Sequence, residues 1–405
     1  MEIPIRKNLL YYSSIIYLVI LNTQILLIEP TFISPLKVGL MAMAPLLLFA
    51  TGLVISKAMI CGLAYWLLCF FPALLQGNMR FSTLGYLGMF IFTFIVYYTT
   101  IFQGAFTLLK FKKILRCLIL AYTVFLILQQ LFSLIGIGQF LLINLASDYQ
   151  GLEKFRSLSL EPSHSAVILS FAYLCYLRCC ELNLGRKPMI RELFSGNHRW
   201  LSIGFLWTMT TMGSGTAYLA LMAFTLYFVK LRSIVPIITG LVLLFALAAN
   251  IDNKQLNRAT KVLIATITGD TKKIAQADGS GATRIVPLIN TFTKLDFSDS
   301  RTWFGHGTLS DDPNSEYSKA WKNMGKNDWF VLPTVRQYGL LAFIVSIILV
   351  YVCCIKRFWS LETLFWFTLG MATLGNVYFH WGTIMMLTAI RYFQEQEERN
   401  LIIEK

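Results

Sequence analysis

The chain has 405 residues, of which 56% are hydrophobic and only 14% are charged, and its mean hydropathy is +0.61. Soluble domains carry about 25% charged residues, so this composition excludes an ordinary soluble protein and indicates a polytopic helical membrane protein. A net charge of +14 would suggest a nucleic-acid partner in a soluble protein, but basic cytoplasmic loops explain it better here.

In chain order, the apolar runs predict about twelve membrane helices, because a run of about 18 or more apolar residues spans a bilayer as a helix. The first run lacks a cleavable signal and is expected to remain as a span. The approximate cores are 9–28, 36–55, 58–75, 85–102, 115–136, 165–180, 201–212, 216–229, 233–249, 329–354, 360–374 and 377–392.

The predicted fold class is therefore an all-α polytopic membrane protein with one large helical loop. Residues 1–249 hold nine spans and an outer loop at 139–164, and residues 250–328 form the large loop. Residues 329–405 hold three more spans and a tail. Apolar spacing at 259–268 and 282–295 predicts helices in the large loop, whereas 311–325 has no such spacing.

The distribution of basic residues between alternate connections predicts the orientation. One set of connections holds most of the Lys and Arg residues and is expected to be cytoplasmic, together with both termini. The outer loop and the large loop are then expected to face outward. Short connections on that outer side carry only Lys37, Arg80, Lys154 and Arg156.

No motif for nucleotide or metal chemistry occurs in the sequence. It contains no Walker loop, Rossmann glycine pattern, HExxH or nucleophile elbow. The eight cysteines lie in spans or at their basic ends, which argues against a disulfide framework, and the adjacent pairs lack zinc-ligand spacing. We expect no metal and no cofactor.

The first candidate constellation is the segment 155–164, FRSLSLEPSH, where the outer loop enters the sixth predicted span. Arg156 can hold a phosphate bidentately, and Glu161 or His164 can take a proton. The structural alternative is an Arg156–Glu161 ion pair beside a Pro-Ser helix start.

Two further constellations lie in the large loop. Gly279 to Arg284 is a Gly/Ser-rich turn before a helix whose first turn holds Arg284, which favours an anion; an ordinary helix start with a solvated Arg is the favoured alternative. Trp303 to Thr308 surrounds His306 with two glycines and presents either an imidazole or aromatic faces to a sugar. Its alternative is a turn that buries the aromatic rings.

The last constellation is at the tenth predicted span. Residues 326–329 precede it, and Arg336 lies about two turns inside it. A charge within a span usually faces a cavity or a partner, although Arg336 can also extend to the interface. Glu362, near the inner end of its span, is expected to reach the interface.

These pieces follow one another in an order that resembles the bacterial O-antigen polymerase/ligase superfamily, the Wzy-type polysaccharide polymerases. Many members have an R-x-x-x-x-(E/N)-P entry to a middle span. A small-residue turn, a G/S-x-x-x-R motif, an aromatic-Gly-x-Gly turn and an H-N-x-(aromatic) entry to a span with a downstream Gly follow it. The Glu-Pro form is most similar to capsule, exopolysaccharide and colanic-acid-type polymerases. The matching segments are Arg156 to Pro162, Gly213 to Thr216, Gly279 to Arg284, Phe304 to Gly307 and Asn327 to Gly339.

The resemblance implies a GT-C-like fold in the bacterial inner membrane and metal-independent glycosyl transfer on its periplasmic side. The donor would be a glycan on undecaprenyl diphosphate, and the acceptor a hydroxyl of a newly flipped lipid-linked repeat unit. Arg156 and Arg284 would hold the diphosphate, with Arg336 as a third candidate. A chain-length regulator and a flippase would be partners.

For the acceptor hydroxyl, the resemblance makes Glu161 the first candidate to activate it, followed by His164 and His306. An O-antigen ligase, which transfers glycan to lipid A-core, is one alternative; ligase-like members have a histidine where this chain has Lys326. A lipid-linked oligosaccharide flippase is another, although two similar halves would be expected of it.

Overall fold

The computed structural model describes much of the chain and part of the large loop. The described residues are 4–24, 34–51, 54–75, 77, 80–136, 139–140, 143–144, 154–228, isolated positions between 261 and 276, 279–293, 295–308, 332–370 and 372–403. The predicted span 233–249 and the irregular stretch 311–325 lie outside them, as do the predicted domain borders near residues 249 and 328.

The chain forms two compact units, each discontinuous in sequence. Unit 1 comprises Met1–Lys112, Pro287–Phe358 and Gly370–Lys405, and unit 2 comprises Lys113–Val286 and Trp359–Leu369. One short segment near the C-terminus, Trp359–Leu369, therefore completes a unit that is built mainly from the middle of the chain.

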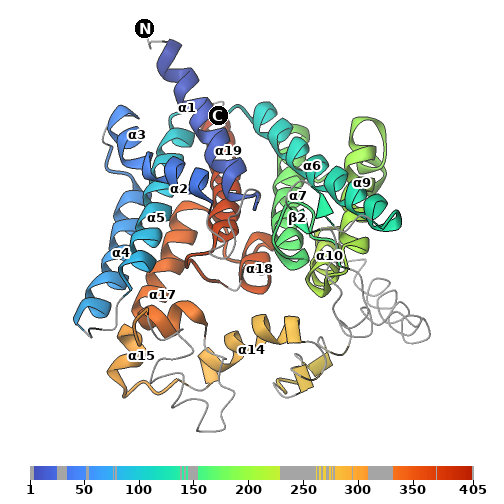
Figure 1. Ribbon diagram of the computed structural model, residues 1–405. Helices are drawn as coiled ribbons and strands as arrows, with labels where there is room; N and C mark the ends of the chain where they lie inside the picture. The colour runs from blue at the N-terminus through green and yellow to red at the C-terminus, as the bar shows by residue number, and fades with distance from the viewer. Residues whose placement is uncertain are drawn as a thin grey trace. The chain divides into compact units, whose positions relative to one another are not determined.

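Unit 1 is a bundle in which α4, α5 and α17 lie side by side and α19 packs on α5 (Figure 1). The Phe90 and Trp381 rings stack in its core at 5.9 Å. Its helices are α1 (Pro4–Leu21), α2 (Pro35–Ala42), α3 (Ala44–Thr51), α4 (Lys57–Leu75), α5 (Phe81–Phe102), α15 (Ser300–Phe304), α17 (Pro333–Cys353), α19 (Tyr378–Ile403) and the end of α14 (Gly279–Thr293).

Two of the predicted spans in unit 1 are interrupted helices. The second predicted span is divided at Met43 into α2 and α3, because Pro45 cannot continue the pattern of backbone donors. Within α17, Gly339 has φ 85° and ψ 172°, so the helix stops and restarts there. The part after Gly339 has about 14 residues, or roughly 21 Å of helix, which is shorter than a bilayer core of about 30 Å.

Unit 2 surrounds α7, whose side chains are buried along most of its length. Phe365 of α18 packs edge-on against Phe171 of α7 and Phe224 of α10. The elements of unit 2 are most of α6 (Leu108–Leu134), β1 (Gln139–Phe140), β2 (Ile143–Asn144), α7 (Pro162–Leu184), α8 (Ile190–Leu193), the 3₁₀ turn η1 (Gly196–His198), α9 (Arg199–Thr211), α10 (Gly215–Phe228) and α18 (Leu361–Thr368).

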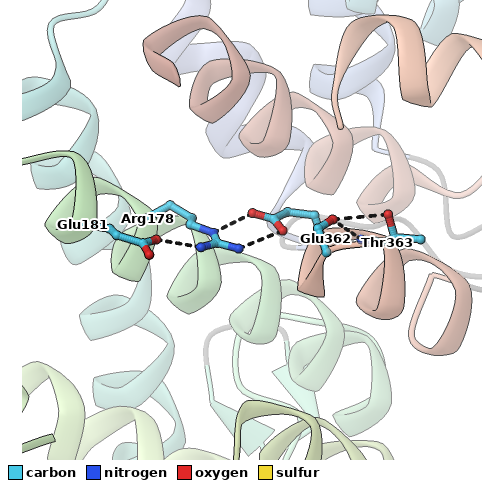
Figure 2. Close-up of polar contacts among 5 residues, drawn as sticks. Arg178, Glu181, Glu362 and Thr363 are labelled. Carbon is cyan, nitrogen blue, oxygen red and sulfur yellow. Dashed lines mark hydrogen bonds and ion pairs between the residues drawn. The ribbon is translucent and has the colours of Figure 1, made fainter. Parts of the chain in front are cut away.

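An ion pair fastens α18 to α7. Arg178 donates from Nε to Glu362 Oε1 at 2.6 Å and from Nη2 to Glu362 Oε2 at 3.0 Å, and it also donates to Glu181 at 2.6 Å (Figure 2). The Glu362 side chain is only 9% exposed. Glu362 thus has a bidentate partner inside unit 2, and the expectation that it reaches the membrane interface stays a prediction.

The described part of the chain is helical apart from the two-residue β1–β2 pair, and helices overlap each predicted span that it includes. Within that part, α4, α5, α6 and α7 are long and apolar enough to cross a membrane, and α17 is so when its two parts on either side of Gly339 are counted together. The fold is therefore that of an α-helical membrane protein. The full number of spans and the side that each loop faces stay predictions.

Candidate functional site

The Arg156 loop, residues 155–165 of unit 2, is built around a strained residue. Ser157 is fully buried and has φ 55°, a left-handed conformation that costs a non-glycine residue about 1–2 kcal/mol. The Gln129 side chain compensates, because its Oε1 accepts from Ser157 N–H at 2.7 Å and its Nε2 donates to Ser157 C=O at 3.2 Å. Ser157 Oγ also donates to Tyr122 C=O at 2.6 Å.

The neighbouring contacts fix the main chain of Arg156 on both sides. Phe155 N–H donates to Met212 C=O at 3.2 Å in the α9–α10 turn, and the Arg156 carbonyl accepts from Ser159 N–H at 3.3 Å. Ser165 Oγ, in the first turn of α7, also donates to this carbonyl. The backbone is held, while the half-buried Arg156 guanidinium forms no ion pair with any described residue.

Glu161 and His164 lie at the start of α7, as the segment predicts. Glu161 is the N-cap residue and is exposed; its Oε2 accepts from Ser163 Oγ at 3.1 Å and lies 3.8 Å from His164 Nε2. Pro162 occupies the first helical position, where its missing N–H is tolerated. The structural alternative of an Arg156–Glu161 ion pair is absent from the described contacts, because Glu161 instead contacts Ser163 and His164.

This geometry places the Arg156 main chain against the first turn of a 23-residue helix. The N-terminus of a helix presents free N–H groups and a partial positive charge, both of which favour an anion. Arg156 also carries a guanidinium, whose paired N–H donors match the spacing of phosphate oxygens. The Arg156 loop therefore has the chemistry of a phosphate or diphosphate site.

The second cluster is the His306 turn, residues 303–308 of unit 1, which is bonded to α17 at its break. His306 N–H donates to Arg336 C=O at 2.8 Å, and Gly307 N–H donates to Gln337 C=O at 3.1 Å. These donors reach carbonyls that lie next to the break at Gly339, where the normal helical bonding is interrupted. The two predicted residues His306 and Arg336 are thus joined through the backbone.

The imidazole of His306 is half-buried beside cations. Burial lowers its pKa below the ordinary 6.5, and the positive charges of Arg301 and Arg336 lower it further, while Asp299 opposes them. A lowered pKa keeps more of the ring neutral near pH 7, the form that accepts a proton. Arg336 lies in the first turns of α17, before the break, rather than two turns inside a continuous span.

Arg80 also lies near this cluster, although the sequence alone did not indicate it as a candidate. The backbone N–H of Arg80, at the start of α5, donates to Thr308 Oγ1 at 2.6 Å, so Arg80 adjoins the His306 turn. The only signal in the sequence is that Arg80 is one of few basic residues in the connections predicted to lie outside. The spacing of neighbouring residues cannot predict the contact of Arg80 with Thr308, because 228 positions separate them in the sequence.

For Arg284, the structure gives only a place on the backbone. The helix α14 begins at Gly279 itself, so the Gly/Ser segment is helical and Arg284 lies in the second turn rather than the first. The side chain of Arg284 lies outside what the structure describes, and so do residues 326–329. Within the described residues, no group of three or more His, Cys, Asp or Glu side chains is arranged to hold a metal.

Each unit thus carries one cluster. Unit 2 brings together Arg156, Glu161 and His164, and unit 1 brings together His306, Arg336 and Arg80. Comparison with known proteins adds no relative to this picture. No protein-family model matches the chain, and neither a curated protein nor a solved structure matches it.

Proposed function

We propose that this protein is a polysaccharide polymerase that joins undecaprenyl-diphosphate-linked oligosaccharide repeat units at the outer face of a bacterial inner membrane. The observation that carries the proposal is the Arg156 loop. A strained backbone, held by hydrogen bonds, sets Arg156 at the N-terminus of a long apolar helix, and no described carboxylate pairs with it. Residues held in strained conformations concentrate at functional sites, where the surrounding contacts hold them.

In the proposed reaction, an acceptor sugar hydroxyl attacks the anomeric carbon of the donor. The new C–O bond forms as the bond to the diphosphate breaks, and undecaprenyl diphosphate leaves. Arg156 and the α7 N-terminus stabilise the negative charge that develops on the leaving group, so no metal is needed in this scheme. Attack opposite the diphosphate inverts the anomeric centre, as the family resemblance implies.

The proton of the acceptor goes to a carboxylate or an imidazole. Glu161 is exposed, and its side chain contacts Ser163 and His164 among the described residues, so an acceptor can reach its carboxylate. His306, with its lowered pKa, is the second candidate base. Arg336 and Arg284 remain candidates for binding the diphosphate or the glycan.

The test uses the purified full-length protein in nanodiscs with a lipid-linked repeat unit as the only glycan substrate. The wild type should produce a ladder of products on lipid, and Arg156→Ala should reduce its rate by about a hundredfold or more, the scale of losing one charge-stabilising donor. Arg156→Lys should recover only part of the rate, because lysine lacks the bidentate geometry. Arg399→Ala, an exposed arginine on α19, is the matched control.

The products separate the alternatives. Transfer to lipid A-core without a ladder would identify a ligase, and transbilayer movement of the substrate without any new glycosidic bond would identify a flippase. Full-rate polymerisation by Arg156→Ala would refute the diphosphate role of Arg156.

A further inference from the structure

The connector that leads from the end of α7 into the first turn of α9, residues 185–200, belongs to neither cluster and is rich in basic residues. It contains four strong cations and a single acid, Glu192. The acid is already satisfied inside the connector. Arg186 donates to both of its carboxylate oxygens, and Met189 N–H donates to it at 2.8 Å. The remaining cations are Lys187, Arg191 and Arg199, all exposed.

These contacts give the connector a fixed shape. Leu193 of α8 is buried, which anchors the short helix, and His198 Nδ1 lies 2.6 Å from the hydroxyl of Tyr176 on α7. The Arg186 guanidinium and the Met189 N–H hold the pKa of Glu192 to about 2, so the internal ion pair persists across the physiological range. The exposed cations therefore belong to a folded surface.

The connector also exposes large apolar side chains. Met189 is 62% exposed, Ile190 55% and Trp200 69%, and Phe194 is also exposed. Arg199 lies over the Trp200 ring at 5.4 Å. Clustered exposed apolar groups mark an interaction surface, and mixed aromatic and basic residues match the boundary between lipid headgroups and acyl chains.

We propose that the connector 185–200 is a binding surface for anionic phospholipid headgroups of the membrane in which the protein resides. Its location supports lipid as the occupant, because the connector directly follows α7, a helix apolar enough to span a membrane. The cations contact the lipid phosphates, while Met189, Ile190 and Trp200 enter the adjacent acyl region. An acidic soluble protein would match the charges alone and leave this apolar group without a role.

The test measures lipid retention by the purified full-length protein. Mixed detergent micelles contain phosphatidylglycerol and phosphatidylcholine in equal amounts, and native mass spectrometry counts the bound lipids. The wild type should retain phosphatidylglycerol preferentially. The triple variant Lys187→Gln, Arg191→Gln, Arg199→Gln should lose roughly fivefold of that preference for each cation removed. The three replaced side chains are exposed, so the unfolding temperature of the variant should match the wild type.

A charge-matched variant, Lys110→Gln, Lys112→Gln, Lys113→Gln, is the control and should keep most of the preference. An equal loss in both variants would show that net charge decides lipid retention, and would overturn the proposal. Displacement of phosphatidylglycerol by soluble polyglutamate would instead assign the surface to an acidic protein. That outcome would also overturn the proposal. Trp200→Ala should weaken retention of both lipids, and unchanged retention would contradict the proposed apolar contact.

Discussion

Gly305 and Gly339 occupy each other's side-chain space. A Cβ on Gly305 would lie 2.7 Å from the Gly339 nitrogen, and a Cβ on Gly339 would lie 2.5 Å from the Gly305 nitrogen. Their φ values are 80° and 85°, a region that favours glycine. The His306 turn and the break in α17 therefore form a single structural feature that needs both glycines.

Replacement of either glycine by alanine should destabilise unit 1. The positive φ alone costs alanine about 1–2 kcal/mol, and the clash with the facing backbone adds to it. Thermal unfolding in detergent measures the loss for Gly305→Ala and Gly339→Ala. Gly85→Ala is the control, since its Cβ would meet nothing within 4 Å and its φ is not positive. Wild-type unfolding temperatures for the two variants would contradict the reciprocal packing.

Gln129→Leu should release the Arg156 loop. The change leaves the buried Ser157 N–H and C=O without the amide that satisfies them, at about 1–3 kcal/mol for each unsatisfied group. Hydrogen–deuterium exchange should rise in peptides covering 155–160. Gln130→Leu tests specificity, because Gln130 bonds to Thr211 and Trp207 of α9 and should leave those peptides protected. Equal exchange in both variants would mean that Gln129 is not the clamp.

Acidification should destabilise the protein through His306. Its pKa is lowered in the folded state by burial, then by Arg301, so the unfolded state binds the proton more readily. The associated stability is present above about pH 6.5 and is lost as the pH falls through the folded pKa. The unfolding temperature of the wild type should therefore drop more between pH 7.5 and pH 5 than that of His306→Gln. Identical drops would exclude this contribution.

If His306 also acts as a base, the acid limb of the polymerisation rate should lie below pH 6.5 in the wild type and should vanish in His306→Gln. A limb of unchanged position in the variant would assign the proton transfer to another group, of which Glu161 is the first candidate.

The buried ion pair on α7 and α18 predicts unequal effects of its two partners. Arg178→Met leaves Glu181 and Glu362 without their shared cation, and should cost about 3–5 kcal/mol. Glu362→Gln should cost less, because Arg178 keeps Glu181. Unfolding in detergent checks the order, and the exposed pair of Arg186 with Glu192 provides a control whose loss should change little. The reverse order would show that Glu181 is not a true partner.

The sequence predicted a helix correctly where the length or the helical spacing of an apolar run is sufficient to identify one. The span predicted at 58–75 is α4 at Lys57–Leu75, and the helix predicted at 282–295 overlaps α14. Hydropathy could not predict the break in α17, because mean hydropathy reports whether a run is apolar and carries no information about the backbone conformation of Gly339. The break depends on Gly305, which lies in a different part of the chain.

In the candidate site too, local spacing predicts some relationships, whereas others depend on residues far apart in the chain. The grouping of Glu161 with His164 follows from local spacing, because residues three positions apart at the start of a helix lie on the same face. Three other relationships depend on distant partners: the support of Ser157 by Gln129, the contact of Arg80 with Thr308, and the pairing of Arg178 with Glu362. Composition and periodicity carry no information about such pairs.

The distance of 184 residues between Arg178 and Glu362 sets an order for biosynthesis. At about 5–20 residues per second, a ribosome makes Glu362 on the order of ten to forty seconds after Arg178. During that interval α7 has only Glu181 to balance its arginine, and unit 2 lacks α18. A nascent chain released early would therefore carry a second unit that lacks both α18 and the buried carboxylate of Glu362.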